Sequence, residues 1–355
     1  MCNFADILTE HMYGIDIKED ELLAMGGGIL DTLLIDRTTG ENIIWATDDY
    51  AHLGDGYTFH NHITVEQITG EHHNVIQPRV LKSKEERKLR AQKMAEVFTP
   101  SWVCNKMNNG VDEAWFKRSP VFNEPHDEGQ RHWWEPTKEK IVFPETLSDD
   151  EQKSGKHKTW QEYVRMGVIE ITCGEAPFLT SRYDTVSGEA ITDLSKRIGW
   201  LDRKMRIVNE NTDSEADWLH WTRMAYKGTL GYEWQGDNLL LARENLLMSC
   251  FDYYEDRFGK EPSLEFVKEI AEIISWNVFQ MDGLKFVIPR SCRTKTLKMP
   301  DLITGEVKIK KIECEGCKKG LIHRHNGIYV QTMDWDTGKT IRFDHINGLA
   351  KKEKL

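Results

Sequence analysis

Two cysteines near the end of the sequence, Cys314 and Cys317, have the Cys-x2-Cys spacing of a zinc site. Two histidines, His323 and His325, follow within a few residues, and Cys292 lies upstream as a further thiol. Thiolate sulfur and imidazole nitrogen are ligands that zinc prefers. Because the spacing is tighter than in the common zinc finger, the two histidines can supply a single ligand between them. We expect a structural zinc ion held entirely by protein ligands. The alternative is a basic turn that contains cysteines by chance.

A second chemically suggestive stretch is the small-residue turn Thr172-Cys173-Gly174. It follows the short apolar run 168–171, which is typical of a strand, and precedes Glu175 and Pro177, which are signals for a helix start. A strand, a glycine turn and a helix N-terminus together form the site where many α/β proteins bind an adenosine-type cofactor. Glycine permits close approach of the backbone, and the helix start offers free N–H groups. An ordinary strand–turn–helix without a ligand is the alternative interpretation.

Two acidic residues stand where strands are expected to end. A strand expected from residue 230 ends at Glu233, before a turn and a strong helix pattern that starts near Gly236, and a strand expected within 277–284 ends at Asp282-Gly283. A carboxylate at the end of a strand can accept hydrogen bonds from both hydroxyls of a ribose. The simpler alternative for Glu233 is a residue that caps the following helix.

Local patterns predict the elements that must position these residues. Apolar side chains three and four positions apart indicate helices, which we expect at residues 82–94, 198–211, 214–227 and 236–247. Residues 265–276 are expected to form a further helix or a helix-to-strand segment. Thr99 is expected as the N-cap of a further helix, with Pro100 as its first residue. Apolar runs predict strands at 29–35 and 43–46, separated by a hairpin turn at 37–41. Alternating apolar and polar residues predict a hairpin at 327–343.

Three other features have two interpretations each. The charged helix 82–94 is either a basic face for phosphate contacts or a solvated helix, and the second is simpler. Residues 112–158 are aromatic and polar with little periodicity, and we interpret them as an insertion that covers the core. The loop histidines have no short ligand spacing and are interpreted as solvated rather than metal-binding; they are His60, His62, His72 and His73.

Composition limits the function classes. The 355 residues carry a net charge of −11, which argues against a chain that mainly coats nucleic acid. The charge is uneven, since residues 290–355 contain 15 Lys and Arg against 8 Asp and Glu. No signal peptide and no apolar run long enough for a membrane span are visible. Seven cysteines, mostly scattered, suit a reducing compartment, so we expect a cytoplasmic protein without a membrane partner.

Four segments follow one another along the chain in this order: Phe98-Thr99-Pro100, residues 170–179, residues 230–234, and the run that ends at Asp282. This order resembles the S-adenosylmethionine-binding half of gamma-type DNA adenine-N6 methyltransferases, the modification proteins of restriction–modification systems. In that family a Phe-Thr-Pro helix start packs against the cofactor, and the glycine loop reads Asp-Pro-x-Cys-Gly-x-Gly-x-Phe-Leu. The matching loop residues are Cys173, Gly174, Phe178 and Leu179, and the departures are Glu170, Ile171 and Ala176.

The resemblance implies a role for each matched position. Glu233 would hold the ribose, Trp234 would lie along the adenine, and Asp282 would accept from the adenine amino group. The implied cofactor-binding set is Phe98, Thr99, Pro100, Glu170, Thr172, Cys173, Gly174, Phe178, Glu233, Trp234 and Asp282.

The catalytic signature of the family, Asn-Pro-Pro-Tyr or Asp-Pro-Pro-Phe, should follow Asp282, yet the 355 residues contain no Pro-Pro pair. In that motif a polar side chain and a proline carbonyl hold the target amino group, while the aromatic ring stacks on the extruded base. No residue of this chain is therefore assigned a catalytic role. We expect a second polypeptide to carry the motif and the DNA-reading surface, and the absent motif argues against activity of this chain alone.

The sequence thus predicts an α/β protein with a Rossmann-like methyltransferase sheet, which can be incomplete. We expect an N-terminal mixed α+β segment at 1–94, an S-adenosylmethionine-binding domain at 95–290 with an insertion at 112–160, and a zinc-binding and hairpin segment at 291–355. The expected function is the cofactor-binding part of a DNA adenine-N6 methyltransferase. One alternative is a degenerate, non-catalytic module that binds DNA or a partner subunit. A nucleotide-dependent oxidoreductase is disfavoured because Gly-x-Gly-x-x-Gly is absent.

Overall fold

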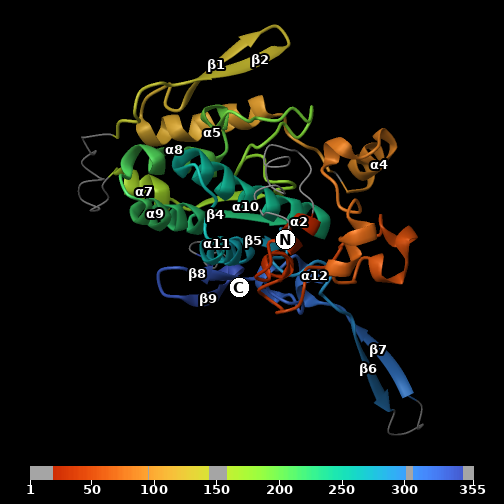
Figure 1. Cartoon of the computed structure of the whole chain (residues 1–355). Coiled ribbons are helices and arrows are strands. Elements are labelled where there is room, and N and C mark those ends of the chain that lie inside the picture. Colours follow the sequence, from red (N-terminus) through yellow and green to blue (C-terminus); the bar gives the residue numbers. More distant parts are fainter. Residues whose placement is uncertain (1–18, 95, 144–157, 301–306, 347–355) are drawn as a thin grey trace, which may run out of the picture.

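The computed structural model describes residues 19–94, 96–143, 158–300 and 307–346 (Figure 1). The helices are α2 (Glu19–Ala24), α3 (Ile29–Leu34), α4 (Lys84–Met94), α5 (Ser101–Phe116), α7 (Trp160–Arg165), α8 (Trp200–Asn211), α9 (Glu215–Lys227), α10 (Gly236–Phe258), α11 (Leu264–Asn277) and α12 (Glu315–Lys319). The strands are β1 (Asn123–Glu128), β2 (Arg131–Pro136), β3 (Val168–Ile171), β4 (Thr229–Glu233), β5 (Val278–Gln280), β6 (Lys295–Pro300), β7 (Val307–Ile312), β8 (Gln331–Asp334) and β9 (Lys339–Arg342). The chain is therefore a mixed α/β protein, as expected.

The central sheet consists of three parallel strands in the order β3-β4-β5. Val168 lies opposite Thr229, and Gly231 lies opposite Val278. Parallel neighbours need a crossover connection, usually helical. Helices α8 and α9 lie between β3 and β4 along the chain, and α10 and α11 lie between β4 and β5. Three predicted strands thus form one sheet, and their carboxyl ends share one edge.

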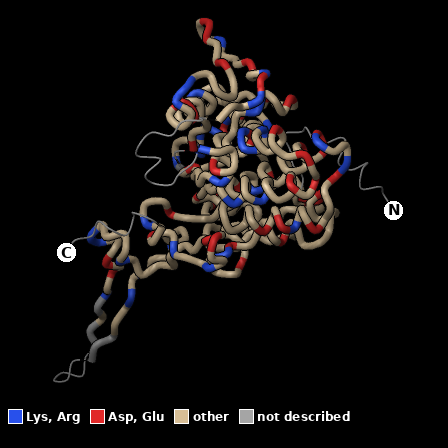
Figure 2. Tube along the Cα trace, turned by 90° about the vertical axis from the view of Figure 1, so that its left-hand side faces the viewer, with Lys and Arg blue, Asp and Glu red and all other residues tan. Residues whose placement is uncertain are grey.

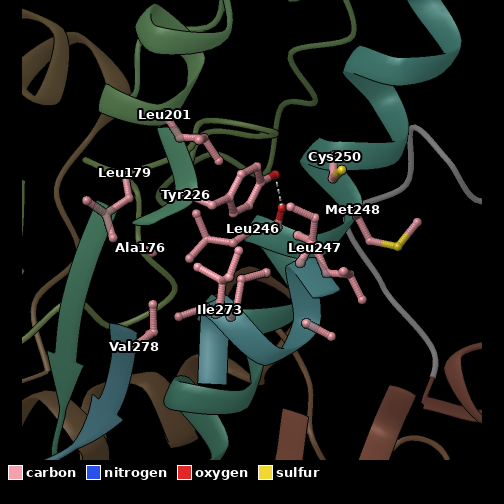
Figure 3. Close-up of a cluster of buried hydrophobic side chains, with 14 of the residues drawn as sticks. Ala176, Leu179, Leu201, Tyr226, Leu246, Leu247, Met248, Cys250, Ile273 and Val278 are labelled. Atoms are coloured by element: carbon pink, nitrogen blue, oxygen red, sulfur yellow. Dashed lines mark hydrogen bonds between the residues drawn. The ribbon is translucent and has the colours of Figure 1, made fainter. Parts of the chain in front are cut away.

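Helices cover one face of this sheet and form the larger core. Val278 points into this core together with Leu246 and Ile273, while the Tyr226 hydroxyl donates to the Leu246 carbonyl at 2.8 Å (Figure 3). Helix α10 has every residue from Gly236 to Tyr254 buried. A helix that is buried all round needs no amphipathic pattern, because it crosses the interior. Helix α10 begins just after β4 ends, at the carboxyl end of that strand.

The opposite face is covered only in part. Side chains of β4 and β5 pack there against the C-terminal segment; the cluster consists of Tyr232, Phe279, Met281, Ile288, Val330 and Phe343 with their neighbours. Over β3, in contrast, Ile169 is 44% and Ile171 is 64% exposed. Among the described residues no strand pairs with the outer edge of β3. The edge formed by β3 is therefore open and has apolar side chains beside it.

The N-terminal segment differs from expectation. Residues 29–34 form helix α3, not a strand, and its buried side chains pack against α10 and α11. The Arg243 guanidinium, itself buried, donates to the carbonyls of Leu33 and Ile35 and so closes the end of this helix. The run 43–46 is not a named strand but forms an isolated bridge from Ile44 to His62, whereas the predicted turn at 37–41 is confirmed.

The helix after the Phe-Thr-Pro segment begins one residue later than predicted. Pro100, not Thr99, is the N-cap, and it makes no side-chain capping bond. The Asp184 carboxylate instead accepts from the Ser101 N–H at 2.7 Å. A distant acid thus replaces the local cap that the sequence suggested.

The interpretation of 112–160 as one insertion is also revised. Residues 112–116 end helix α5, and β1 and β2 form a hairpin that projects from the helical body (Figure 1). Residues 144–157 lie outside the described residues. The helices expected at 82–94, 198–211, 214–227, 236–247 and 265–276 and the hairpin at 327–343 are confirmed. No described helix combines the length and apolar character needed to cross a bilayer.

Candidate functional site

A cleft of about 970 Å³ opens at the carboxyl ends of β3 and β4. Its floor is the turn after β3 and the end of β4, and its walls come from the segment before α5, from α5 itself, and from the starts of α8 and α10. Nine of the residues that the resemblance implies line it: Phe98, Thr99, Glu170, Thr172, Cys173, Gly174, Phe178, Glu233 and Trp234. Segments separated by more than one hundred residues in the sequence therefore meet around one space.

The turn after β3 is a series of tight backbone bends. Thr172, Gly174 and Ala176 all have positive φ, at 48°, 54° and 64°. The helix that we expected here is absent, and residues 172–180 form consecutive turns. The left-handed Ala176 interrupts helical geometry. The Glu170 carboxylate accepts from the N–H groups of Phe178 (3.4 Å) and Leu179 (3.1 Å), and thus it satisfies donors that a helix start would leave free.

Gly174 brings the turn into contact with the Phe-Thr-Pro segment. A Cβ added to Gly174 would lie 3.3 Å from the Phe98 ring, and the residue has a left-handed φ that favours glycine. Phe98 also has the Arg79 guanidinium over its ring, 5.1 Å from the ring centroid. The Phe98 side chain, which precedes α5 in the sequence, is therefore a wall of the cleft that contacts both an arginine and the glycine turn.

Glu233 joins β4 to the glycine turn. One carboxylate oxygen accepts from the Gly174 N–H at 2.8 Å, and the other accepts from the N–H groups of Trp234 and Gln235. Burial raises the pKa of this carboxyl above the ordinary value, although the three backbone donors partly oppose that shift. Burial also raises the pKa of Glu170 well above its ordinary value. None of these N–H groups belongs to α10, which begins at Gly236 with Gln235 as its N-cap, so Glu233 does not cap that helix.

Pro100 and Asp282 do not line the cleft. The Asp282 carboxylate accepts from the Leu284 N–H at 3.1 Å and pairs with the Lys285 ammonium at 2.9 Å. Its backbone N–H donates to the Val287 carbonyl. Asp282 therefore closes the turn after β5, and the structure gives it a local role in place of the one implied by resemblance.

Several cleft residues carry no clear sequence signal. Met107 and Val111 of α5 are four residues apart and are 58% and 49% exposed, so one turn of an apolar stripe faces the cleft rather than the core. Trp200 begins α8 on the opposite wall. Glu96 and Asn238 also line the cleft, and each has a buried side-chain oxygen without a hydrogen-bond partner among the described residues. Such acceptors suit a ligand that brings its own donors.

The second candidate site is a cluster formed by Cys292, Cys314, Cys317 and His325, whose ligand atoms all lie within 4.8 Å of one another. The His325 Nδ1 lies 3.5, 3.6 and 3.6 Å from the three sulfur atoms. Zn–S bonds of about 2.3 Å and Zn–N bonds of about 2.0–2.1 Å at a tetrahedral angle give an S···N separation of roughly 3.5–3.6 Å. The cluster can hold a metal ion with that geometry.

The structure selects one of the two histidines. His323 is not a member of the cluster, because its Nδ1 lies 2.9 Å from the Asp344 carboxylate. The upstream Cys292 takes the fourth position instead. Gly316 permits the approach of the histidine, since a Cβ there would lie 2.7 Å from the His325 ring.

The thiols of the cluster have unequal acidity. Although burial opposes ionisation, hydrogen bonds from the backbone N–H groups of Cys317 and Asn326 lower the pKa of Cys314 to about 6. Burial, together with hydrogen bonds to the other two sulfurs, raises the pKa of Cys292 to about 12. A bound cation would displace the retained proton, since thiolates are the metal ligands.

No protein-family model, curated protein or solved structure matches this chain. The interpretation of both sites therefore depends on the residues and their geometry.

Proposed function

We propose that the chain is the S-adenosylmethionine-binding part of a DNA adenine-N6 methyltransferase. The observation that carries this proposal is the convergence of Phe98, Gly174 and Glu233 on one cleft at the carboxyl ends of parallel strands. Ligands of open α/β sheets bind at that edge. The unpaired oxygens of Glu96 and Asn238 would accept from the amino or hydroxyl groups of the cofactor. In this proposal the cofactor supplies the electrophilic methyl group, and the protein supplies position and charge.

Cofactor titration tests the proposal. Isothermal calorimetry with the full chain should give micromolar affinity for S-adenosylmethionine. Glu233→Ala should weaken it about 100-fold, because the loss of a buried, charged acceptor costs about 1.5–3 kcal/mol or more. Since Glu233 also holds three backbone N–H groups, Glu233→Gln serves as a milder variant with an intact fold, and about a tenfold loss is expected.

Asp282→Asn is the matched control. This substitution removes one negative charge, as Glu233→Gln does, from a strand-end acid that does not line the cleft. The cofactor affinity should therefore stay within about threefold of wild type. Equal losses in Glu233→Gln and Asp282→Asn would show that the cleft is not the binding site. No binding by the wild type at millimolar cofactor would refute the proposal, and the non-catalytic module would then be the better reading.

We further propose that a second polypeptide completes the enzyme at the open edge of β3. An edge strand presents unpaired backbone groups, and parallel sheets are normally covered on both faces. The exposed Ile169 and Ile171 lie on that edge and line the cleft. A partner with the Asn-Pro-Pro-Tyr motif would add its strand there, next to the cofactor.

Co-purification checks this assignment. The product of an adjacent reading frame that carries the motif should bind the chain, and Ile171→Glu should abolish the complex while Leu284→Glu, at another exposed apolar position, should not. Loss of the complex in both variants, or in neither, would remove the support for the β3 edge.

The metal proposed for the cysteine cluster is zinc. Three thiolates and one imidazole leave no open position in a tetrahedral site, so the ion would be structural. Its expected role is to fix the chain around the cluster.

A further inference from the structure

Strands β6 and β7 form an antiparallel ribbon that extends away from the body of the protein (Figure 1). Its register runs from Lys295 opposite Ile312 to Pro300 opposite Val307. The side chains of Leu297 and Ile309 are 45% and 64% exposed. A two-stranded ribbon that packs on nothing is marginally stable in water, so its presence calls for an anchor and a partner.

The anchor is the cysteine cluster. Cys292 lies three residues before β6 and Cys314 lies two residues after β7, so the cluster joins both ends of the ribbon at its base. Asn326 adds two hydrogen bonds there, since it accepts from the Arg293 N–H at 3.1 Å and donates to the Arg293 carbonyl at 2.7 Å. The ribbon is thus held in one direction, which reduces the entropy cost of binding through it.

The charge of the ribbon is opposite to that of the chain. The two strands, Lys-Thr-Leu-Lys-Met-Pro and Val-Lys-Ile-Lys-Lys-Ile, contain five lysines and no acidic residue. Figure 2 shows Lys and Arg on both strands of the ribbon, whereas the body mixes both signs. The whole chain has a net charge of −11. A projecting cationic segment on an anionic protein indicates an anionic partner.

We propose that the β6–β7 ribbon binds double-stranded DNA, with the exposed Lys295 and Lys311 on the phosphates and its strands in the major groove. The major groove of B-form DNA admits a two-stranded ribbon, whereas that of A-form RNA is too narrow. The choice of DNA among polyanions rests on the proposed function. The inference goes beyond that function because it assigns DNA contact to this chain and not only to its partner.

Fluorescence anisotropy of the full chain with a labelled duplex tests the ribbon. Lys295→Gln/Lys311→Gln removes two exposed charges from it, and Lys138→Gln/Lys140→Gln removes two exposed charges from the loop after β2. Each phosphate contact contributes about −0.9 to the slope of log affinity against log salt concentration. The loss of two contacts should therefore make the ribbon variant bind roughly 50-fold more weakly at 0.1 M salt. The control variant should bind within about threefold of wild type.

Three results would overturn the inference: no binding of duplex DNA by the wild type at 0.05 M salt, equal losses in both variants, or equal affinity for an RNA duplex or for vesicles that contain phosphatidylserine. Cofactor titration of the same preparations separates the two proposals. Unchanged cofactor affinity in the ribbon variant leaves the cleft intact. Failure of the wild type to bind cofactor, with duplex binding retained, would remove the proposed function and leave DNA binding by the ribbon in place.

Discussion

Asp237→Asn is expected to lower the free energy of unfolding by about 3–5 kcal/mol, because it removes a buried anion that pairs with two buried cations at once. Asp237 lies in the first turn of α10 with its side chain fully buried. Its carboxylate is 2.8 Å from the Arg90 guanidinium and 3.2 Å from the Lys82 ammonium, and both cations are less than one-tenth exposed. Asparagine keeps the shape but removes the carboxylate that pairs with Lys82 and one of the three carboxylates around Arg90.

The same group makes stability depend on pH. Burial alone would raise the pKa of Asp237, but Arg90 and Lys82 outweigh it and hold the pKa well below the ordinary value of 3.8. A carboxyl with a depressed pKa stabilises the fold above its unfolded pKa and loses that contribution as the pH falls towards its folded pKa. Acid unfolding of the wild type should therefore steepen below about pH 4, and Asp237→Asn should lack this component.

Urea unfolding followed by tryptophan fluorescence measures both effects. Glu269→Gln is the matched control, because it breaks an ion pair with Arg223 whose side chains are 31% and 45% exposed. Exposed pairs contribute about 0–1 kcal/mol. A loss for Asp237→Asn no larger than the loss for Glu269→Gln would contradict the reading of a buried network. Because Arg90 also binds Glu96, a cleft residue, the variant should weaken cofactor binding as well.

Elements with local signals were predictable. Ser214 and Ser263 accept from the N–H groups of Asp217 and Phe266, and the helices they cap fall where apolar spacing placed them. Glu233 was recognisable as a strand-end acid for the same reason, since strand, acid and helix follow one another directly. The residues that contact each of these side chains include residues close to it in the sequence.

Elements decided by tertiary contact were not predictable. Residues 29–34 form a short apolar run that is compatible with a strand or a buried helix, and packing on α11 selects the helix. Asp282, like Glu233, is an acid at a predicted strand end, but its carboxylate accepts from the Leu284 N–H and pairs with Lys285. Met107, Val111 and Trp200 line the cleft only because α5 and α8 flank it. Such residues follow from the assembled fold.

The identity of the histidine ligand also depends on tertiary contacts. It leads to a large expected difference in zinc binding between substitutions of two histidines. His325→Gln should abolish zinc binding, whereas His323→Gln should leave it unchanged. Only His325 presents a nitrogen 3.5–3.6 Å from three sulfurs. The His323 ring lies against Asp344, where it can be replaced without loss of a ligand. Both histidines lie close to Cys314 and Cys317 in the sequence. Only in the folded chain does His325, and not His323, lie beside Cys292.

Zinc content per chain and competition with a chelating dye measure the contrast. We expect about one zinc ion per wild-type chain and at least roughly 100-fold weaker retention in His325→Gln, since loss of an inner ligand exceeds the 10–100-fold cost of outer partners. Cys292→Ser should resemble His325→Gln, because it removes the ligand that lies before the ribbon. Loss of zinc in His323→Gln would mean that the Cys-x2-Cys and His-x-His spacing, rather than the observed cluster, describes the site. A wild type that takes up no zinc would leave the ribbon without its anchor, and β6–β7 should then exchange its amide hydrogens as freely as an unfolded segment.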